Sequence, residues 1–380
     1  MNDYECKHNK ILRDMGAECT VLLKKDGKFP LSGAGEIALY GSGARNTIKG
    51  GTGSGEVNSR FFVTMEQGLE EEGFRITSKD WLDGYDRIRS EARTKFLADL
   101  KAEAKKKHQN VMILSMGRSM PEPEYELPLK ADGYTGIYVL SRISGEGNDR
   151  APVEGEIYLS RTEIRDILAC NEKYENFMLV LNTGGVVDLS PVMDVKNILL
   201  FSQLGVESGH ILADILLGRQ SPSGKLSTTW SAWKDYPAIG EFGEKDDTCY
   251  KEGIYVGYRY FDSVNKESLF PFGYGLTYTE FQSTVEAISL DQDVVTVTVH
   301  VQNKGVYAAK EVEQLYVTIP EGKLDQPYQI LAGFAKTELL EPGQEQKLSL
   351  IHISLWAFHH PPMYGKLDDS SGRGIPCYHV

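Results

Sequence analysis

A regular alternation of short apolar runs with helix-forming segments, between residues 111 and 217, constrains the fold more than any other feature of this sequence. A capping box, Ser160 with Glu163 three residues later, predicts a helix before the apolar run at residues 177–181. A second helix is predicted over residues 208–217. A longer amphipathic helix is predicted over residues 82–107, where apolar residues recur at every fourth position. Strands that alternate with helices form a mainly parallel sheet covered on both faces, so we predict an α/β three-layer sandwich. The apolar runs have the length and β-branched content of buried strands, and they occupy residues 111–115, 137–140, 177–181 and 198–201.

A glycine-rich stretch follows a short strand predicted at residues 36–40. Six glycines lie between Gly41 and Gly55, and glycine permits positive φ angles and close approach of the backbone to a ligand. A loop folded over a ligand and a flexible surface loop are both consistent with this composition. The stretch lacks the Gly-Lys-Ser/Thr element of a phosphate-binding loop, so we do not expect nucleotide binding.

A charged loop follows the strand predicted at residues 137–140. It contains Glu146, Asp149 and Arg150. Ligands of open α/β sheets bind outside the carboxyl ends of the strands, so this loop is a candidate functional site. The alternative is a solvated turn in which Asp149 and Arg150 form a weak ion pair.

The composition changes after Trp230. From about residue 283 the pattern becomes strand-like: valine occupies every second position of residues 295–301, so the valine face should be buried, and a second strand is predicted over residues 312–319. Short strands between Gly and Pro turns indicate a small β-sandwich. Before it lies an aromatic cluster of five residues: Tyr250, Tyr255, Tyr258, Tyr260 and Phe261. These rings could stack on sugar rings, although packing at a domain junction is the commoner outcome.

Composition argues against several classes of function. The net charge of −13 disfavours nucleic acid or an anionic membrane as a partner. No apolar run suits a signal peptide or a membrane span, and the five cysteines are scattered, so we expect reduced thiols and a cytoplasmic location. Gly-x-Ser-x-Gly and His-Glu-x-x-His motifs are absent, and we expect neither a metal nor a cofactor. The adjacent His359 and His360 are interpreted as incidental, and His210 as a packed or capping residue.

Several passages resemble glycoside hydrolase family 3, and the likeness covers about residues 10–350. The resemblance implies an α/β sandwich domain over residues 1–265, a linker over 266–283 and a fibronectin type III-like domain over 284–380. The last has an atypical tail from about residue 351, with which a complete and an incomplete sandwich are both consistent. The passages are SPSGKLSTTW at 221–230, EGIYVGYRYFD at 252–262, FPFGYGLTYTEF at 270–281, VQNKGVYAAKEVEQLYVTIP at 301–320 and LAGFAKTELLEPG at 331–343.

The resemblance also implies an activity. In this family a TIM-like barrel supplies a nucleophilic Asp, and the α/β sandwich domain supplies the general acid/base. The segment SRISGEGNDR is similar to the acid/base loop of one branch of the family, so Glu146 is the expected acid/base of a retaining β-glucosidase. The expected substrate is a β-linked glucoside or a related oligosaccharide. The residues expected to bind or orient it are Lys49, Gly50, Gly51, Thr52, Asp149 and Arg150.

Two departures from the family pattern affect this expectation. The barrel is not among the printed residues, although the start of the chain resembles the branch in which the barrel comes last, so the nucleophile cannot be named. In the tail after residue 350, Pro361 and Pro362 are adjacent, which suits neither a strand nor a helix. We hypothesise that a shifted or terminated reading frame produced this tail; sequencing the parent DNA would test that.

Three functions are consistent with these observations. The chain is the acid/base domain of a β-glycosidase whose nucleophile lies outside it, a carbohydrate-binding or structural remnant without hydrolysis, or an oligomerisation module. The last is favoured by the exposed sheet edge that missing closing strands would leave, and it would make the chain a homo-oligomer.

Overall fold

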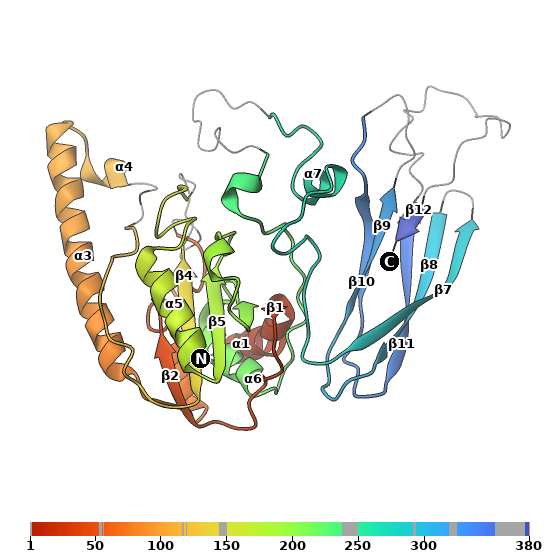
Figure 1. The fold of residues 1–380 in the computed structure, drawn as a ribbon, viewed down its shortest axis with the longest axis horizontal. Coiled ribbons are helices and arrows are strands. Elements are labelled where there is room, and N and C mark those ends of the chain that lie inside the picture. The colour runs from red at the N-terminus through yellow and green to blue at the C-terminus, as the bar shows by residue number, and fades with distance from the viewer. Residues whose placement is uncertain are drawn as a thin grey trace. The chain divides into compact units, whose positions relative to one another are not determined.

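The computed structural model describes residues 2–52, 55, 57–115, 118, 120–143, 150–237, 250–291, 294–318, 325–353 and 377–379. Contacts divide the chain into two compact units, shown in Figure 1. The first unit comprises Met1–Lys225, Trp230–Asp247 and Tyr274–Tyr278, and the second comprises Leu226–Thr229, Thr248–Gly273 and Thr279–Val380. The domain boundaries expected from the sequence remain predictions. Among the described residues, no helix is both long and apolar enough to cross a membrane.

The first unit contains a six-stranded sheet in the order β1-β6-β5-β4-β2-β3. Every neighbouring pair is parallel except β1 and β6, which are antiparallel. All eight residues of β4 are buried, as expected for a strand covered on both faces. The predicted mainly parallel sheet is therefore confirmed. The strands are β1 (Val21–Lys24), β2 (Glu36–Tyr40), β3 (Arg75–Ile76), β4 (Thr135–Arg142), β5 (Asn176–Thr183) and β6 (Ile198–Leu200).

Helices flank this sheet, and the predicted helix starts are largely confirmed. The capping box at the start of α5 is present: the Glu163 amide donates to Ser160 Oγ (3.2 Å), and the Ser160 amide donates to Glu163 Oε2 (2.8 Å). The α-helices of this unit are α1 (Asp3–Gly16), α2 (Met65–Glu71), α3 (Lys79–Lys106), α4 (Val111–Ser115), α5 (Arg161–Lys173) and α6 (Ser208–Leu216). Short 3-10 helices occupy Ala17–Cys19, Ser190–Val192, Gly205–Glu207 and Trp233–Asp235.

The strand predicted at residues 111–115 is wrong, because this segment forms the short helix α4. Asn110 explains the difference. Its side-chain Oδ1 accepts from the amide of Met112 (2.8 Å), and its carbonyl accepts from the amide of Leu114 (3.0 Å), which together start a helical turn. A five-residue apolar run carries too little periodicity to distinguish a strand from a helix. The run is not buried either, since Met112 and Ile113 are exposed.

Helices α2 and α6 cross with almost no space between their backbones. A Cβ atom added to Gly68 would lie 2.1 Å from the carbonyl carbon of Gly209, and one added to Gly209 would lie 2.0 Å from the carbonyl oxygen of Thr64. Only glycine fits at these two positions. The crossing holds α6, and therefore the end of β6 that leads into it, against α2.

Strand β1 is held by a chain segment that is very distant in the sequence. The amide of Leu276 donates to the carbonyl of Leu22 (2.8 Å), and the two residues form an isolated antiparallel bridge. Residues Tyr274–Tyr278 therefore belong to the first unit although the surrounding segments belong to the second.

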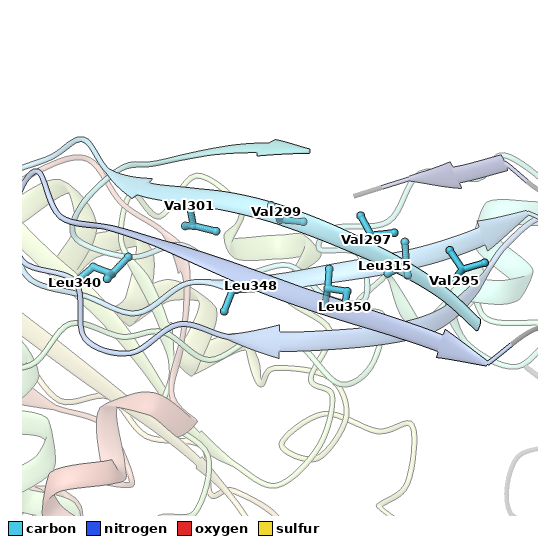
Figure 2. Packing of buried hydrophobic residues seen from close by; sticks show 8 residues of the cluster. All are labelled: Val295, Val297, Val299, Val301, Leu315, Leu340, Leu348 and Leu350. Carbon is cyan, nitrogen blue, oxygen red and sulfur yellow. The ribbon is translucent and has the colours of Figure 1, made fainter. Parts of the chain in front are cut away.

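The second unit contains two three-stranded antiparallel sheets, in the orders β11-β8-β7 and β10-β9-β12. The valines of β8 are buried together with leucines of β9 and β11, as Figure 2 shows, which confirms the predicted valine face. The elements are α7 (Tyr258–Ser263), β7 (Phe281–Asp291), β8 (Val294–Asn303), β9 (Val312–Thr318), β10 (Ile330–Lys336), β11 (Glu345–Ile353) and β12 (Cys377–His379). Tail residues 354–376 and 380, including His359, His360 and the adjacent prolines, lie outside the described residues.

Strand β7 is exposed along nearly its whole length. Its residues Val285, Ile288 and Leu290 pair in register with Val299, Val297 and Val295 of β8, so they lie on the same face of the sheet as the buried valines. Their exposed fractions are nevertheless 42%, 57% and 69%. The inner face of β7 is thus an apolar surface that the second sheet does not cover.

The aromatic cluster packs within the second unit. The ring of Tyr258 stacks on that of Phe272 with centroids 4.5 Å apart, and Tyr258 Oη accepts from the amide of Leu331 (2.8 Å). Phe261 is buried, whereas Tyr250 is exposed. The rings of this cluster therefore serve mainly in packing.

Candidate functional site

The carboxyl ends of β2, β4, β5 and β6 meet at one edge of the parallel sheet, called here the carboxyl edge. The glycine-rich stretch leaves β2 there, and residues 143–150 leave β4 there. Gly184 and Gly185 follow β5, and Ser202 and Gln203 follow β6. Parallel sheets present their ligand-binding loops at this edge, so it is the candidate functional site.

Asn182, a wholly buried residue of β5, joins three of these strand ends. Its Oδ1 accepts from the amide of Ile48 (2.6 Å) and from Ser141 Oγ (3.1 Å). Its Nδ2 donates to the carbonyls of Ile48 (2.9 Å) and Ser202 (2.7 Å). One amide thus fixes the glycine-rich stretch against β4, β5 and the segment after β6. A polar residue near the end of an apolar strand was the signal in the sequence that could have indicated this role.

The predicted sugar-binding stretch, residues 49–52, therefore begins at a fixed position on the carboxyl edge. The Lys49 carbonyl accepts from the amide of Gly205 (3.0 Å). Its ammonium donates to the carbonyl of Val57 (2.6 Å) and to Ser59 Oγ (2.8 Å). The Lys49 side chain thus links the beginning of this stretch to the residues that follow it. Gly50, Gly51 and Thr52 are half-buried, which leaves part of their backbone open to a ligand.

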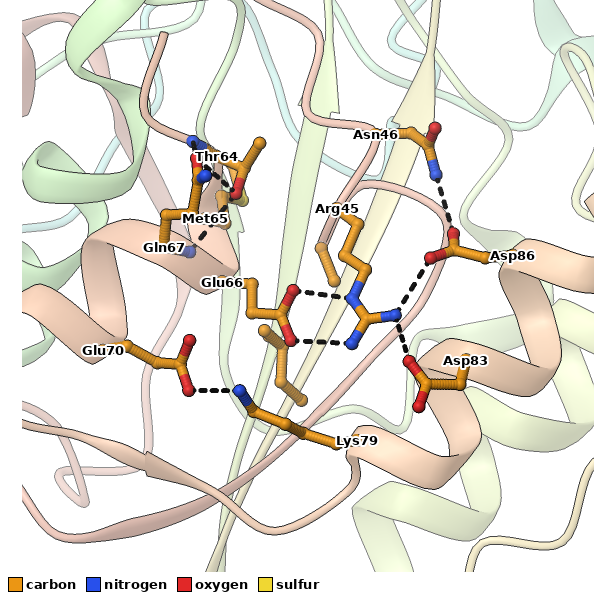
Figure 3. Close-up of polar contacts among 12 residues, drawn as sticks. Arg45, Asn46, Thr64, Met65, Glu66, Gln67, Glu70, Lys79, Asp83 and Asp86 are labelled. Atoms are coloured by element: carbon orange, nitrogen blue, oxygen red, sulfur yellow. Dashed lines mark hydrogen bonds and ion pairs between the residues drawn. The ribbon is translucent and has the colours of Figure 1, made fainter.

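Arg45 fixes the start of the same stretch to two helices, as Figure 3 shows. Its Nε and Nη2 contact the two carboxylate oxygens of Glu66 on α2 (2.6 and 3.0 Å). Its Nη1 contacts Asp83 (2.6 Å) and Asp86 (3.0 Å) on α3. The hydrogen bonds that Arg45 donates to the Glu66 carboxylate are the main cause that raises the pKa of Arg45. Sequence reasoning missed this residue because its three partners are distant in the chain.

Arg142, the last residue of β4, forms a buried ion pair directly before the loop that contains Glu146. Its Nη1 and Nη2 contact the two carboxylate oxygens of Glu163 (2.9 and 2.6 Å), and its Nε donates to the carbonyl of Glu156 (3.0 Å). Burial lowers the pKa of Arg142, but the Glu163 carboxylate outweighs burial, so the pKa is raised and the guanidinium stays charged. Because Glu163 also caps α5, one carboxylate fixes both the end of β4 and the start of α5.

Glu122 is a half-buried carboxyl close to this ion pair. It accepts a hydrogen bond from Tyr85 Oη (2.6 Å). Burial, and next the charge of Glu163, raise the pKa of Glu122 to about 7. This side chain therefore binds a proton near neutral pH. A lone Glu between two prolines gave no indication of this in the sequence.

The structure places only part of the predicted charged loop. Glu146 and Asp149 lie outside the described residues, and so does any Asp149–Arg150 ion pair. Arg150 is described, and its Nη2 donates to the carbonyl of Val186 (2.6 Å), beyond the end of β5. Burial, and next the charge of Arg142, lower the pKa of Arg150. Arg150 thus lies at the same carboxyl edge as the glycine-rich stretch.

His210 is a packed residue of α6, as predicted. Its Nδ1 is 2.6 Å from Glu207 and its Nε2 is 2.7 Å from Glu71 of α2. Burial lowers the pKa of His210, but these two carboxylates outweigh burial, so the pKa is raised. Within the described ranges, no group of three or more His, Cys, Asp or Glu side chains is arranged to hold a metal ion.

A mainly parallel sheet covered by helices, followed by a unit of antiparallel sheets, defines a two-module protein with an α/β and an all-β part, and sequence comparison specifies it further. Residues 20–278 match the family described as the glycosyl hydrolase family 3 C-terminal domain, and residues 311–353 match the fibronectin type III-like domain. The chain therefore belongs to glycosyl hydrolase family 3, which confirms the resemblance seen in the sequence.

Curated relatives and solved structures agree with this membership. The chain is 33% identical to beta-glucosidase A of Butyrivibrio fibrisolvens, over 90% of the chain and 45% of that protein. It is 31% identical to thermostable beta-glucosidase B of Acetivibrio thermocellus, over 90% of the chain and 42% of that protein. The structure of beta-glucosidase 3B from Thermotoga neapolitana in complex with glucose matches 93% of the chain and 49% of its own, with 36% identity and a TM-score of 0.78. The chain thus spans less than half the length of these relatives.

Proposed function

We propose that this chain supplies the general acid/base domain of a retaining β-glucosidase, with Glu146 as the proton donor to the leaving oxygen. The observation that carries the proposal is the match of residues 20–278 to the family, together with relatives that are named as β-glucosidases. The ordered carboxyl edge supports it, because the loop that contains Glu146 leaves β4 there. The proposed substrate is a β-linked glucoside, and the proposed location is the cytoplasm.

In the proposed reaction one carboxylate attacks the anomeric carbon while Glu146 gives its proton to the departing oxygen, and Glu146 then removes a proton from the attacking water. The attacking carboxylate lies outside the printed residues. Within this chain, the Arg142–Glu163 pair fixes the strand end from which the Glu146 loop starts. The backbone of Gly50 and Gly51 approaches the sugar, and Lys49, Thr52, Asp149 and Arg150 bind or orient it.

The test supplies the missing nucleophile. The full chain is fused to a family 3 barrel domain, and turnover of aryl β-glucosides is compared for Glu146→Gln and for a control, Glu91→Gln, on the exposed face of α3. We expect Glu146→Gln to lower kcat by about 100-fold or more, with larger losses for poorer leaving groups because these need the proton most. The control should retain activity. A Glu146→Gln fusion as active as the parent on every leaving group contradicts the proposal.

The unfused chain should show little or no turnover, because a lone acid lacks the covalent partner that divides the reaction into two easier steps. Robust turnover by the pure chain contradicts this expectation. Binding of glucose without turnover, even in the fusion, would instead support the alternative of a carbohydrate-binding remnant.

A second candidate function, self-association, is favoured by one specific observation. The inner face of β7 exposes Val285, Ile288 and Leu290 although it continues the buried valine face of β8. An exposed edge strand with an apolar face pairs readily with another strand. A second copy of this chain is the proposed occupant, which would make the protein a homo-oligomer.

A further inference from the structure

Two buried N–H donors at the carboxyl edge have no acceptor. They are Nη1 of Arg150 and Nε2 of Gln203, and each lies out of reach of solvent with no hydrogen-bond partner among the described residues. A buried donor that neither protein nor water satisfies is costly, so such groups are uncommon in folded proteins. Two of them at one end of one sheet therefore require an explanation.

The two side chains flank the same pair of glycines, directly after β5. A Cβ atom added to Gly184 would lie 3.1 Å from Gln203 Oε1, and one added to Gly185 would lie 3.0 Å from Arg150 Nη2. The absence of side chains at Gly184 and Gly185 is thus what lets Arg150 and Gln203 approach this backbone. The pair of donors and the pair of glycines form one local arrangement, called here the glycine shelf.

The backbone that positions Gln203 is itself unusual. Ser202 has a φ angle of 61°, in the left-handed region that residues with a Cβ atom seldom occupy. Its carbonyl accepts from Asn182 Nδ2 (2.7 Å), so the amide that fixes the glycine-rich stretch also maintains this conformation. Strain of this kind is typical of functional sites, where the surrounding structure holds it in place.

The glycine shelf carries the positive charge of Arg150, on which the carboxylate of Glu156 acts. Arg142 forms a bidentate ion pair with Glu163, whereas no carboxylate among the described residues is given within ion-pair distance of Arg150. Among the residues that the structure describes, the acceptor of Arg150 is the neutral carbonyl of Val186. A guanidinium with an unused N–H beside an amide donor suits an anionic oxygen group better than a neutral hydroxyl, because charge-assisted hydrogen bonds are the stronger ones.

We propose that Arg150 and Gln203 form a subsite on the glycine shelf for the carboxylate of an acidic sugar. Arg150 Nη1 donates to one carboxylate oxygen and Gln203 Nε2 to the other. This inference rests on the proposed function in that the ligand is a carbohydrate, and it adds a specificity that the family membership does not supply.

Calorimetric titration of the full chain carrying Glu146→Gln tests the subsite by binding alone, so its outcome does not depend on turnover. The probes are glucuronate, glucose and acetate. We expect glucuronate to bind at least about tenfold more tightly than glucose or acetate, the advantage that two charge-assisted hydrogen bonds supply. Arg150→Met should reduce that preference to within about twofold, and Gln203→Leu should reduce a tenfold preference to about threefold.

Two further variants separate recognition from folding. Arg161→Met removes an exposed arginine of α5 and should leave the preference unchanged. Gly185→Ala retains every charge but places a methyl group against the Arg150 guanidinium, so it should abolish the preference even if Arg150→Met fails to fold. Equal affinity for glucuronate and glucose overturns the proposal, and so does a preference that Arg150→Met and Gly185→Ala do not change. Acetate binding as tight as that of glucuronate also overturns it, because the site would then take a free anion rather than a sugar.

Discussion

Arg142 and Glu163 contact each other through two parallel N–H···O pairs, and their side chains are only 4% and 1% exposed. The pair joins the last residue of β4 to the capping box of α5. It therefore links the strand that presents the proposed catalytic loop to the helix that follows that loop in the chain.

Removing one member of this pair should destabilise the first unit strongly. Arg142→Met leaves the Glu163 carboxylate buried without its partner, and loss of one member of a buried ion pair costs about 3–5 kcal/mol. The measurement is unfolding in urea, monitored by tryptophan fluorescence. Arg161→Met, at an exposed position on the same helix as Glu163, serves as the control and should change the free energy of unfolding by less than about 0.5 kcal/mol. Similar unfolding midpoints for the two variants would contradict the structural role of the pair.

Glu122 should make stability depend on pH. Its pKa is raised from 4.5 to about 7, so folding favours the protonated form. The protonated Glu122 carboxyl therefore contributes to the free energy of unfolding in full below pH 4.5, and this contribution is lost as the pH rises through about 7. Its total is on the order of 3 kcal/mol. Glu122→Gln mimics the protonated carboxyl and should flatten this part of the stability profile. Denaturation at a series of pH values between 4 and 8 gives the comparison, and parallel profiles for parent and variant would refute the assignment.

The glycine crossing of α2 and α6 should tolerate no added methyl group. Gly209→Ala would place its Cβ 2.0 Å from a backbone oxygen, which the helices relieve only by moving apart. Overpacking of this kind costs about 1–3 kcal/mol, and rigid backbone neighbours favour the upper end. Gly33→Ala is the matched control, since nothing lies within 4 Å of a Cβ there. Thermal melting of both variants decides the point, and an unchanged melting temperature for Gly209→Ala would show that the crossing is looser than described.

The exposed face of β7 should control association in solution. Ile288→Lys puts a charge on this face, and we expect it to shift the chain from an oligomer to a monomer at micromolar concentration. Ser289→Lys, the next residue and therefore on the opposite face of the strand, should leave the oligomer intact. Size-exclusion chromatography with light scattering measures the mass. A parent chain that is monomeric throughout the concentration range removes the support for self-association.

Local signals in the sequence predicted much of the fold. The Ser160–Glu163 capping box forms as expected, and the alternating valines of β8 face the core. Residues 111–115 show the limit of this reasoning, because the Asn110 side chain decides between a strand and a helix where five apolar residues do not.

The site was less accessible from sequence. The glycine-rich stretch and Arg150 both lie at the edge where parallel strands bring their carboxyl ends together, and their role in binding a ligand stays a prediction. Asn182 and Arg45, which fix the glycine-rich stretch, act through partners far away in the chain. No spacing rule connects such residues before the topology is known.

The bridge between Leu22 and Leu276 has a consequence for synthesis on the ribosome. Strand β1 leaves the ribosome well before its partner at Leu276, which follows only after most of the first unit and part of the second have been translated. Contacts between residues so distant in the chain form slowly and late. Until residues 274–278 are made, the outer edge of β1 in the nascent first unit therefore stays unpaired. A pause or stop in translation before residue 274 would leave this strand edge open to aggregation.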